Sequence, residues 1–259
     1  MELTAITRQV SARINDCELS FHARQRIDVA KAVAQHKVYQ DCLVELGARI
    51  ISLPAEQGLP DAVFVEDAAL VVDEVAVITN MGAPSRRAES NSLAKTLSQY
   101  RPLKFLIEPA TLDGGDVLRV GRSVFVGLSR RTNRHGIDQL RDLLRAYDYQ
   151  VQPVQVKSCL HLKSACSYIG NGTILVNRSW VDAEQLRGFE LLDVPAEEPA
   201  AANALLLNNV VILPASFPKT RALLENRAFS TRIIDVSELQ KAEAGVTCCS
   251  LIFNSKARQ

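Results

Sequence analysis

Two adjacent cysteines, Cys248 and Cys249, lie close to the C-terminus in a Gly-Val-Thr-Cys-Cys-Ser segment. The apolar residues around them predict a strand. A thiol in such a segment is either a small core side chain or, as a thiolate, a nucleophile. The second alternative requires a histidine that moves a proton, an acidic partner for that histidine and a pocket for a cationic substrate. Residue types suited to all three occur elsewhere in the chain.

An acidic segment, Leu-Pro-Asp-Ala-Val-Phe-Val-Glu-Asp over residues 59–67, places three carboxylates around an apolar centre. We expect Glu66 and Asp67 at the edge of a buried strand. One interpretation is a turn carboxylate at Asp61 followed by a helix or strand cap. The other is a binding site, because partly buried carboxylates need cations or hydrogen-bond donors to stay ionised. A guanidinium offers a fork of N–H donors that matches a pair of carboxylates.

A second acidic segment, Thr-Leu-Asp-Gly-Gly-Asp-Val-Leu over residues 111–118, places Asp113 and Asp116 on either side of a glycine pair. Glycine allows close approach of neighbouring groups, so a tight loop can direct an acid inward. Alone, this pattern also suits a hairpin or a calcium-binding turn. The Leu-Ser-Arg-Arg-Thr-Asn segment over 128–133 follows closely and favours a functional role.

His161 lies between two leucines in Cys-Leu-His-Leu-Lys-Ser, which predicts an apolar strand. A single histidine in such a strand is most often a core residue. A histidine that acts as general acid and base needs a carboxylate on one ring nitrogen and the reacting group on the other. Asp113 and Cys248 have the right chemistry to be these two partners.

The elements that must position these residues alternate between short apolar runs and helical patterns. The spacing of apolar residues predicts helices over 27–46, 90–99, 136–147 and 216–225. Strands are predicted over 49–53, 63–65, 69–72, 75–79, 105–107, 117–120, 123–126, 173–176, 205–207, 210–213, 232–235 and 250–253. Short polar turns close the strand pairs. Two strands, a helix and a further strand form a unit of roughly 50 residues, and five such units would account for the chain.

The overall composition excludes several classes of protein. The 259 residues, 47% of them apolar, suffice for one sizeable core or two modest ones, and the absence of a Ser/Gly-rich linker favours a single domain over 1–259. With 30 basic and 29 acidic side chains, neither nucleic acid nor a membrane is the expected partner. No leader peptide or membrane span is recognisable, and we expect a soluble cytoplasmic protein.

The cysteines and histidines do not predict a metal centre or a disulfide framework. Six cysteines without paired C-x-x-C spacing indicate free thiols in a reducing compartment. A structural zinc site would need a closely spaced Cys/His quartet, and a site built on Cys248 and His161 would supply only two protein ligands.

Six segments, in this order along the chain, resemble motifs of the dimethylarginine dimethylaminohydrolases, members of the guanidine-modifying or pentein superfamily. They are Asp-Ala-Val-Phe-Val-Glu-Asp (61–67), Gly-Ala-Pro-Ser-Arg-Arg (82–87), Thr-Leu-Asp-Gly-Gly-Asp (111–116), Gly-Leu-Ser-Arg-Arg-Thr-Asn (127–133), Leu-His-Leu-Lys-Ser (160–164) and Val-Thr-Cys-Cys-Ser (246–250). The resemblance extends from about residue 50 to residue 253. It implies an α/β propeller of five ββαβ modules with pseudo-fivefold symmetry and an active site in the central channel.

The resemblance also implies a role for each matching residue. Cys248 would be the nucleophile, His161 the proton-transfer residue and Asp113 its orienting carboxylate. The implied substrate-binding residues are Leu19, Asp61, Phe64, Glu66, Asp67, Arg86, Arg131 and Ala242. Among them, Asp61, Glu66 and Asp67 would line the guanidinium pocket, and Arg86 and Arg131 would bind the α-carboxylate of the substrate. No cofactor and no metal are expected, and a homodimer is an open alternative.

The implied reaction is hydrolysis of a methylated arginine to citrulline and an amine through a covalent thiouronium on Cys248. The sequence departs from the family pattern at Asn80-Met81, at Ala242 and in a lid region over residues 16–22. Arginine or another alkylguanidine or ureido compound therefore remains an alternative substrate. An amidinotransferase and a non-catalytic propeller that binds ribosomes or proteins are the alternatives of other classes.

Overall fold

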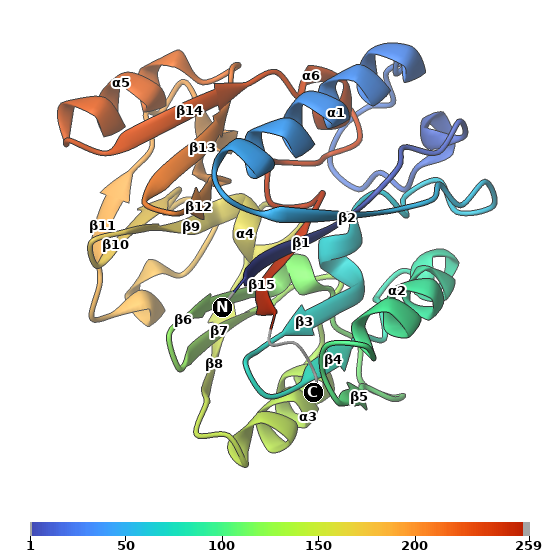
Figure 1. The fold of residues 1–259 in the computed structure, drawn as a ribbon. Helices are drawn as coiled ribbons and strands as arrows, with labels where there is room; N and C mark the ends of the chain where they lie inside the picture. Colours follow the sequence, from blue (N-terminus) through green and yellow to red (C-terminus); the bar gives the residue numbers. More distant parts are fainter. Residues whose placement is uncertain (1, 256–259) are drawn as a thin grey trace.

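The computed structural model describes residues 2–255, and their strands form five three-stranded sheets around a central axis (Figure 1). In chain order the sheets contain β15 (Leu251–Ser255), β1 (Glu2–Arg8) and β2 (Arg49–Leu53); β3 (Ala69–Val71), β4 (Ala76–Ile78) and β5 (Leu103–Phe105); β6 (Val117–Val120), β7 (Ser123–Leu128) and β8 (Gln150–Gln155); β9 (Cys166–Gly170), β10 (Thr173–Val176) and β11 (Glu190–Asp193); and β12 (Leu205–Leu207), β13 (Val210–Pro214) and β14 (Ser230–Ile234). The first-named strand of each sheet is the inner one. This is the predicted five-bladed α/β propeller.

Every sheet repeats the same pairing. The inner and middle strands are antiparallel, and the middle and outer strands are parallel. A parallel pair needs a long crossover, usually a helix. Helices α1 (Val29–Glu45), α2 (Ser90–Leu97), α3 (Arg134–Arg145) and α5 (Pro218–Asn226) fill this role in four modules. The predicted ββαβ unit is confirmed there, whereas the fourth module uses only a short 3-10 turn, η5 (Ala183–Leu186).

The two ends of the chain complete one sheet together. Strand β15 pairs with β1 from Glu2 opposite Ser255 to Ile6 opposite Leu251, and Figure 1 shows the red strand beside the dark blue one. Strand β1 was not predicted, because its Thr-rich sequence lacks a clear apolar alternation. Its threonines are fully buried, and the Thr4 hydroxyl donates to Ser255 Oγ at 3.0 Å.

Helix α3 shows how sequence specifies a crossover. Asn133 caps its N-terminus by accepting a hydrogen bond from the Gly136 amide at 2.8 Å. Ile137, Leu140 and Leu144 follow at helical spacing and are fully buried against the sheet of their own module. The helix that sequence periodicity predicted over 136–147 is therefore present, two residues earlier at each end.

Three predicted strands that carry site residues are wrong. Residues 63–65 form a turn that enters the 3-10 helix η2 (Val65–Ala68), His161 caps the short helix α4 (Leu162–Ala165), and Cys248 and Cys249 lie in a turn before β15. These segments are apolar because they are buried. Contacts such as Glu66 N to Cys248 O at 3.2 Å hold them as turns rather than as sheet.

The remaining differences concern outer and inner strands of weak pattern. Strands β8, β9 and β11 were not predicted, and the strand expected over 105–107 occurs as β5, two residues earlier. Strand β8 contains Pro153, which an outer strand tolerates because only one of its edges is paired. The predicted domain, 1–259, includes Met1 and residues 256–259, which lie outside the described range.

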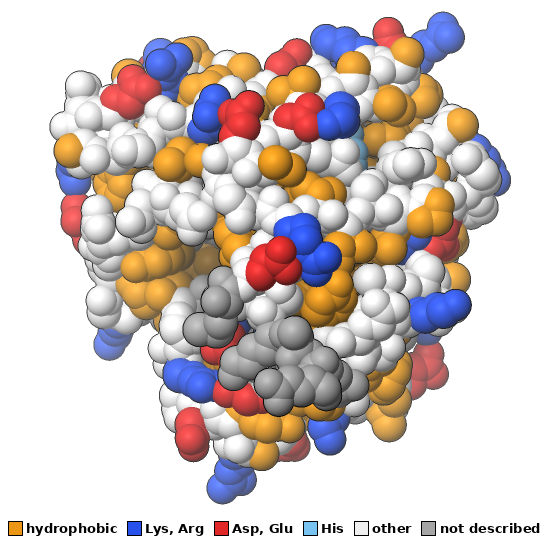
Figure 2. All heavy atoms as spheres, in the orientation of Figure 1, with side chains coloured by type: hydrophobic (Ala, Val, Ile, Leu, Met, Phe, Trp, Pro, Cys, Tyr) orange, Lys and Arg blue, Asp and Glu red, His pale blue; other side chains and the backbone are white. Residues whose placement is uncertain are grey.

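A cavity of about 380 Å³ lies on the central axis and is bordered by all five inner strands. The face of the molecule in Figure 2 carries acidic and basic side chains interspersed rather than separated into patches of one sign. Among residues 2–255, no helix combines the length and the apolar character needed to cross a membrane.

Candidate active site

The residues singled out in the sequence come together because each precedes an inner strand. Glu66 and Asp67 lie just before β3, Asp113 before β6 and Cys248 before β15. His161 precedes β9 through the one-turn helix α4. Since the five inner strands surround one axis, the segments that lead into them converge at the same end of the central channel.

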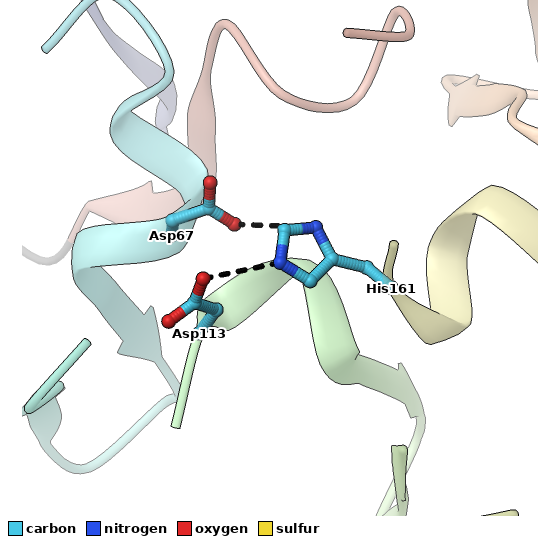
Figure 3. Close-up of side chains that lie close together, drawn as sticks. All are labelled: Asp67, Asp113 and His161. Carbon is cyan, nitrogen blue, oxygen red and sulfur yellow. Dashed lines mark hydrogen bonds and ion pairs between the residues drawn. The ribbon is translucent and has the colours of Figure 1, made fainter. Parts of the chain in front are cut away.

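His161 lies between two buried carboxylates (Figure 3). Its Nε2 is 3.1 Å from Asp113 Oδ2, and its Nδ1 is 3.9 Å from Asp67 Oδ1. Burial alone would lower the pKa of His161, but the carboxylates of Asp67, Asp113 and Asp116 outweigh it and raise the pKa to about 9. The imidazole is therefore protonated at neutral pH and can donate a proton.

Asp113 is held rigidly in its contact with His161. It is fully buried, and its Oδ1 accepts the Gly82 amide at 2.8 Å while Oδ2 faces the imidazole. Asp116 fixes the residue that follows His161, because its carboxylate accepts the Leu162 amide. The same carboxylate accepts the hydroxyls of Ser129 and Thr132. Burial is the main cause that raises the pKa of Asp116 to about 6.

Cys248 and Cys249 have different surroundings. Cys248 is half-buried, its Sγ accepts the Gly245 amide at 3.3 Å, and it lines a cavity together with His161. Burial, followed by the carboxylates of Glu66 and Asp67, raises the pKa of the Cys248 thiol to about 12. Cys249 is 2% exposed and belongs to the hydrophobic cluster that contains Phe64.

Arg86 does not present its guanidinium to the cavity. Its Nη1 donates to Asp67 Oδ2 at 2.8 Å, and its Nε and Nη2 donate to the two oxygens of Glu89 at 3.0 and 2.9 Å. All three groups are buried. Burial would raise the pKa of Asp67, but the charges of His161 and Arg86 lower it, so Asp67 stays ionised beside the imidazole.

Glu66 is likewise already paired. Its Oε1 is 2.5 Å from Lys163 Nζ, and its Oε2 accepts the Thr247 hydroxyl at 2.7 Å. Asn203 joins this group by accepting the Thr247 amide and donating to the Thr247 hydroxyl. Glu66, Lys163 and Thr247 border the 380 Å³ cavity, whose lining does not include His161.

The cavity that contains Cys248 and His161 is a different one, of about 320 Å³. Its wall includes the aromatic side chains of Phe21, Trp180 and Phe217. Phe21 belongs to the lid segment, which we define as residues 17–26. The site therefore opens between the lid segment and the modules that carry Trp180 and Phe217.

Arg131 has a charged group without a full set of partners. Its Nη2 donates to Ser20 Oγ at 3.2 Å, whereas its buried Nη1 has no hydrogen-bond partner among residues 2–255. The nearest carboxylate oxygen, Asp113 Oδ2, is 4.0 Å from Nη1. A guanidinium in this state is suited to binding an anionic ligand group.

The other predicted substrate-binding residues lie around the lid segment. Asp61 accepts the Glu18 amide with both carboxylate oxygens, at 3.2 and 3.1 Å. Phe64 and Ala242 are buried in one hydrophobic cluster, and Leu19 packs against that cluster. Asp61 and this hydrophobic cluster therefore hold Glu18 and Leu19 of the lid segment.

Sequence reasoning missed several residues of the site. Glu89, Lys163 and Asn203 hold Arg86, Glu66 and Thr247 respectively. Lys163 lies within the motif that contains His161 but was given no role, and the segments of Glu89 and Asn203 gave no chemical signal. Asp116 had a signal in the Asp-Gly-Gly-Asp motif, and its partner Thr132 lies in the motif over 128–133. Asp67, Asp113 and His161 also offer donor atoms within 4.8 Å of one another that could surround a cation, although Arg86 already occupies one oxygen of Asp67.

The chain is similar to known proteins over nearly its whole length. The family described as N,N dimethylarginine dimethylhydrolase, eukaryotic, matches residues 4–252. An N(G),N(G)-dimethylarginine dimethylaminohydrolase from Streptomyces coelicolor is 35% identical over 248 residues, which cover 95% of each chain.

Solved structures of this kind have the same fold. The Pseudomonas aeruginosa dimethylarginine dimethylaminohydrolase, a cysteine-to-serine variant complexed with citrulline, superposes with a TM-score of 0.92 at 31% identity over 98% of this chain and all of that one. A histidine-to-glycine variant that forms an adduct with S-methyl-L-thiocitrulline gives a TM-score of 0.93 at 32% identity with the same coverage. The chain therefore belongs to the dimethylarginine dimethylaminohydrolase family, within the pentein superfamily.

Proposed function

We propose that this protein is a cysteine-dependent hydrolase that converts N-omega-methylated arginine to citrulline and methylamine or dimethylamine. The observation that carries the proposal is the opening of Cys248 and His161 onto one cavity, with His161 held between Asp67 and Asp113. A nucleophile beside an acid/base residue that a third group orients is the arrangement of covalent catalysis. The citrulline and thiocitrulline complexes of two relatives support a substrate of this class.

The charges of the site suggest how the substrate is bound. We place the guanidinium against Asp67, which stays ionised and adjoins His161. The α-carboxylate is assigned to Arg131, because its Nη1 lacks a partner. Arg86, expected from the resemblance to share that role, is instead assigned to holding Asp67, since Asp67 and Glu89 already take its donors.

Substrate binding would activate the nucleophile. With the thiol pKa near 12, Cys248 is almost entirely neutral in the free protein at pH 7. A bound guanidinium offsets the carboxylates that raise this pKa, and the thiol proton leaves to solvent through the cavity. The thiolate then attacks the guanidinium carbon, and a C–S bond forms.

The remaining steps use His161 twice. Protonated His161 donates its proton to the methylated nitrogen, and the C–N bond breaks with release of the amine and formation of a thiouronium on Cys248. The neutral imidazole next takes a proton from water, whose oxygen attacks the same carbon. The C–S bond then breaks, the remaining hydroxyl proton passes to the Cys248 sulfur and restores the thiol, and neutral citrulline is released.

The direct test is product formation from four compounds: dimethylarginine, monomethylarginine, arginine and agmatine. We expect citrulline and the matching amine from the two methylated arginines. Their kcat/KM should be at least about tenfold above that of arginine, because the proposed substrate is a methylated rather than an unmethylated arginine. Cys248→Ser should abolish turnover, and Cys249→Ser should retain it. No product from any of the four would disprove the proposed function.

A further inference from the structure

Three consecutive backbone amides of the lid segment converge on one carboxylate. The amides of Phe21 and His22 each donate to Glu243 Oε1 at 2.6 Å, and the Ser20 amide donates to both oxygens at 3.0 Å. Successive N–H groups that surround an anion form a nest, and bonds to a charged acceptor are stronger than those between neutral groups. The Glu243 carboxylate thus joins the lid segment to a residue more than 200 positions away in sequence.

The backbone of Glu243 is in a conformation that is unfavourable for a residue with a side chain. Its φ is +59°, in the left-handed region that glycine adopts more readily than any residue with a side chain. A glycine would satisfy the turn better. Strain of this kind persists where surrounding contacts require it, and here the side chain provides the contacts to the lid segment.

Glu243 also lies next to the reacting groups. It borders the 320 Å³ cavity with Phe21, Cys248 and His161. It lies five residues before Cys248, in the turn whose Gly245 amide donates to the Cys248 thiol at 3.3 Å. The position of the lid segment and the turn that carries the nucleophile are therefore connected through one side chain.

The same lid residues contact the group assigned to the substrate carboxylate. Ser20, whose amide Glu243 holds, accepts a hydrogen bond from Arg131 Nη2 at 3.2 Å through its hydroxyl. The guanidinium of Arg130 lies over the ring of Phe21, with the guanidinium carbon 5.4 Å from the ring centre. Displacement of this part of the lid segment would remove a support of Arg131 as well as the cover of the cavity.

We propose that Glu243 is a positioning residue that keeps the lid segment closed over Cys248 and His161 and, through Ser20, keeps Arg131 in place for the substrate carboxylate. The effect on substrate affinity rests on the proposed function, whereas the closed state of the lid segment does not. Lid closure of this kind excludes water and completes a binding site.

The test compares Glu243→Gln, Glu243→Asp and Glu243→Gly with the unchanged protein and with Glu197→Gln. Glu197 is an exposed acid that pairs with Lys219 far from the lid segment in sequence, and it serves as the matched control. Two readouts need no turnover: the rate of trypsin cleavage after Arg24 and Arg26, which are exposed in the lid segment, and the rate of Cys248 alkylation, resolved by peptide mass spectrometry. A third readout is the KM and kcat for dimethylarginine.

We expect Glu243→Gln and Glu243→Gly to raise both rates about tenfold, because charge-assisted bonds to the lid segment are lost. Glu243→Asp should restore part of the protection, and Glu197→Gln should change nothing. KM should rise about tenfold with kcat changed less than about threefold. Alkylation of Cys42, which is buried in helix α1, must stay slow, since a rise there would report general unfolding.

Glu243→Gly gives the sharpest contrast. If Glu243 served only to shape the turn, glycine would relieve the strain and leave lid cleavage and alkylation unchanged, and that result would overturn the proposal. Unchanged rates in Glu243→Gln would overturn it too. Faster cleavage and alkylation in a protein that hydrolyses no guanidino compound would support the lid role and disprove the proposed function instead.

Discussion

At the scale of single residues, the site is defined by which charges are already paired. Asp67 and Glu66 are neighbours in sequence, yet Asp67 faces His161 while Glu66 is bound by Lys163 and Thr247 beside the other cavity. Arg86 and Arg131 likewise differ: Arg86 is fully paired with Asp67 and Glu89, whereas the buried Nη1 of Arg131 has no hydrogen-bond partner among residues 2–255. Of these two arginines, only Arg131 retains, within the described part of the chain, an N–H group that is free to meet a ligand.

The two arginines should therefore respond differently to substitution. Arg131→Ala should raise the KM for methylarginines at least about tenfold more than the KM for an agmatine-like compound without a carboxylate. Arg86→Ala should lower the free energy of unfolding by roughly 3 to 5 kcal/mol, because it leaves Asp67 and Glu89 buried without their cation. Steady-state kinetics and urea denaturation measure the two effects. Equal KM increases for both substrates with Arg131→Ala would remove its role as carboxylate ligand.

Residue types in the sequence were enough to select Cys248, His161 and Asp113 as a group, and the structure places His161 against Asp113 and on one cavity with Cys248. The sequence could not show that Arg86 and Glu66 are internally paired. Their partner Glu89 lies in a segment without a distinctive pattern, and Lys163, although it lies in the motif that contains His161, is a single charged residue whose pairing the motif does not indicate. Whether a charge is free depends on tertiary contacts, which local sequence does not specify.

At the scale of elements, the segments that lead into the inner strands are as important as the strands. Tight turns there bring side chains to the axis, and some have no room for a side chain of their own. A Cβ on Gly115 would lie 2.5 Å from His161 Nδ1 and 2.8 Å from Asp67 Oδ1. Glycine at this position is what allows the imidazole to approach the Asp67 carboxylate.

Gly115→Ala should therefore displace His161 and lower kcat by about a hundredfold, since misplacement of a catalytic group by about 1 Å can have an effect of that size. Gly58→Ala is the matched control, because a Cβ on Gly58 meets no atom within 4 Å. Circular dichroism should show both variants folded. A Gly115→Ala variant with the kcat of the unchanged protein would contradict the assigned position of His161.

Periodicity predicted the crossover helices well because their apolar faces are regular, as in α3. It failed for the turns at the site, because residues 63–65, His161 and the cysteine pair lie in short apolar runs whose pattern could not be distinguished from that of a strand. These segments are turns rather than strands because a turn there brings a side chain to the central axis. That requirement appears only when the five modules are assembled.

At the scale of the whole molecule, five repeats of one pairing pattern create a channel with different ends. The cavity at one end contains Cys248 and His161, and a separate cavity on the axis is bordered by Glu66 and Lys163. The length of the repeat and the number of modules could be predicted from the spacing of strands and helices. The closure of the ring by β1 and β15 could not, because neither terminal segment shows locally which strand it will pair with.

The protonation of His161 should make the free energy of unfolding depend on pH. Its pKa is about 9 in the folded protein, above the ordinary value of 6.5. Protonated His161 therefore stabilises the fold fully below pH 6.5, and the contribution is lost as the pH rises through 9. The expected loss is roughly 3 kcal/mol over this interval.

Urea denaturation of the unchanged protein and of His161→Asn, in steps from pH 6.5 to 9.5, measures this contribution. The difference between the two free energies of unfolding should shrink as the pH rises, because only the unchanged protein loses the contribution of a protonated imidazole. The effects of groups remote from His161, such as the Cys42 thiol, are common to both proteins, whereas removal of His161 raises the pKa of Asp116 and makes the change smaller. A difference that stays constant across the interval would show that His161 is not held as a cation.

The central claim is that Cys248 forms a covalent intermediate with a guanidino substrate. Acid quenching during turnover of dimethylarginine, followed by fragmentation mass spectrometry of the peptide that contains both cysteines, tests it most directly. We expect an adduct with the mass of the substrate less its amine, located on Cys248. In His161→Gly the same adduct should accumulate from S-methyl-L-thiocitrulline, whose methanethiolate leaves without a proton from His161, but not from dimethylarginine, whose amine needs that proton. An adduct on Cys249, or citrulline formation without any adduct on Cys248 in either protein, would contradict it.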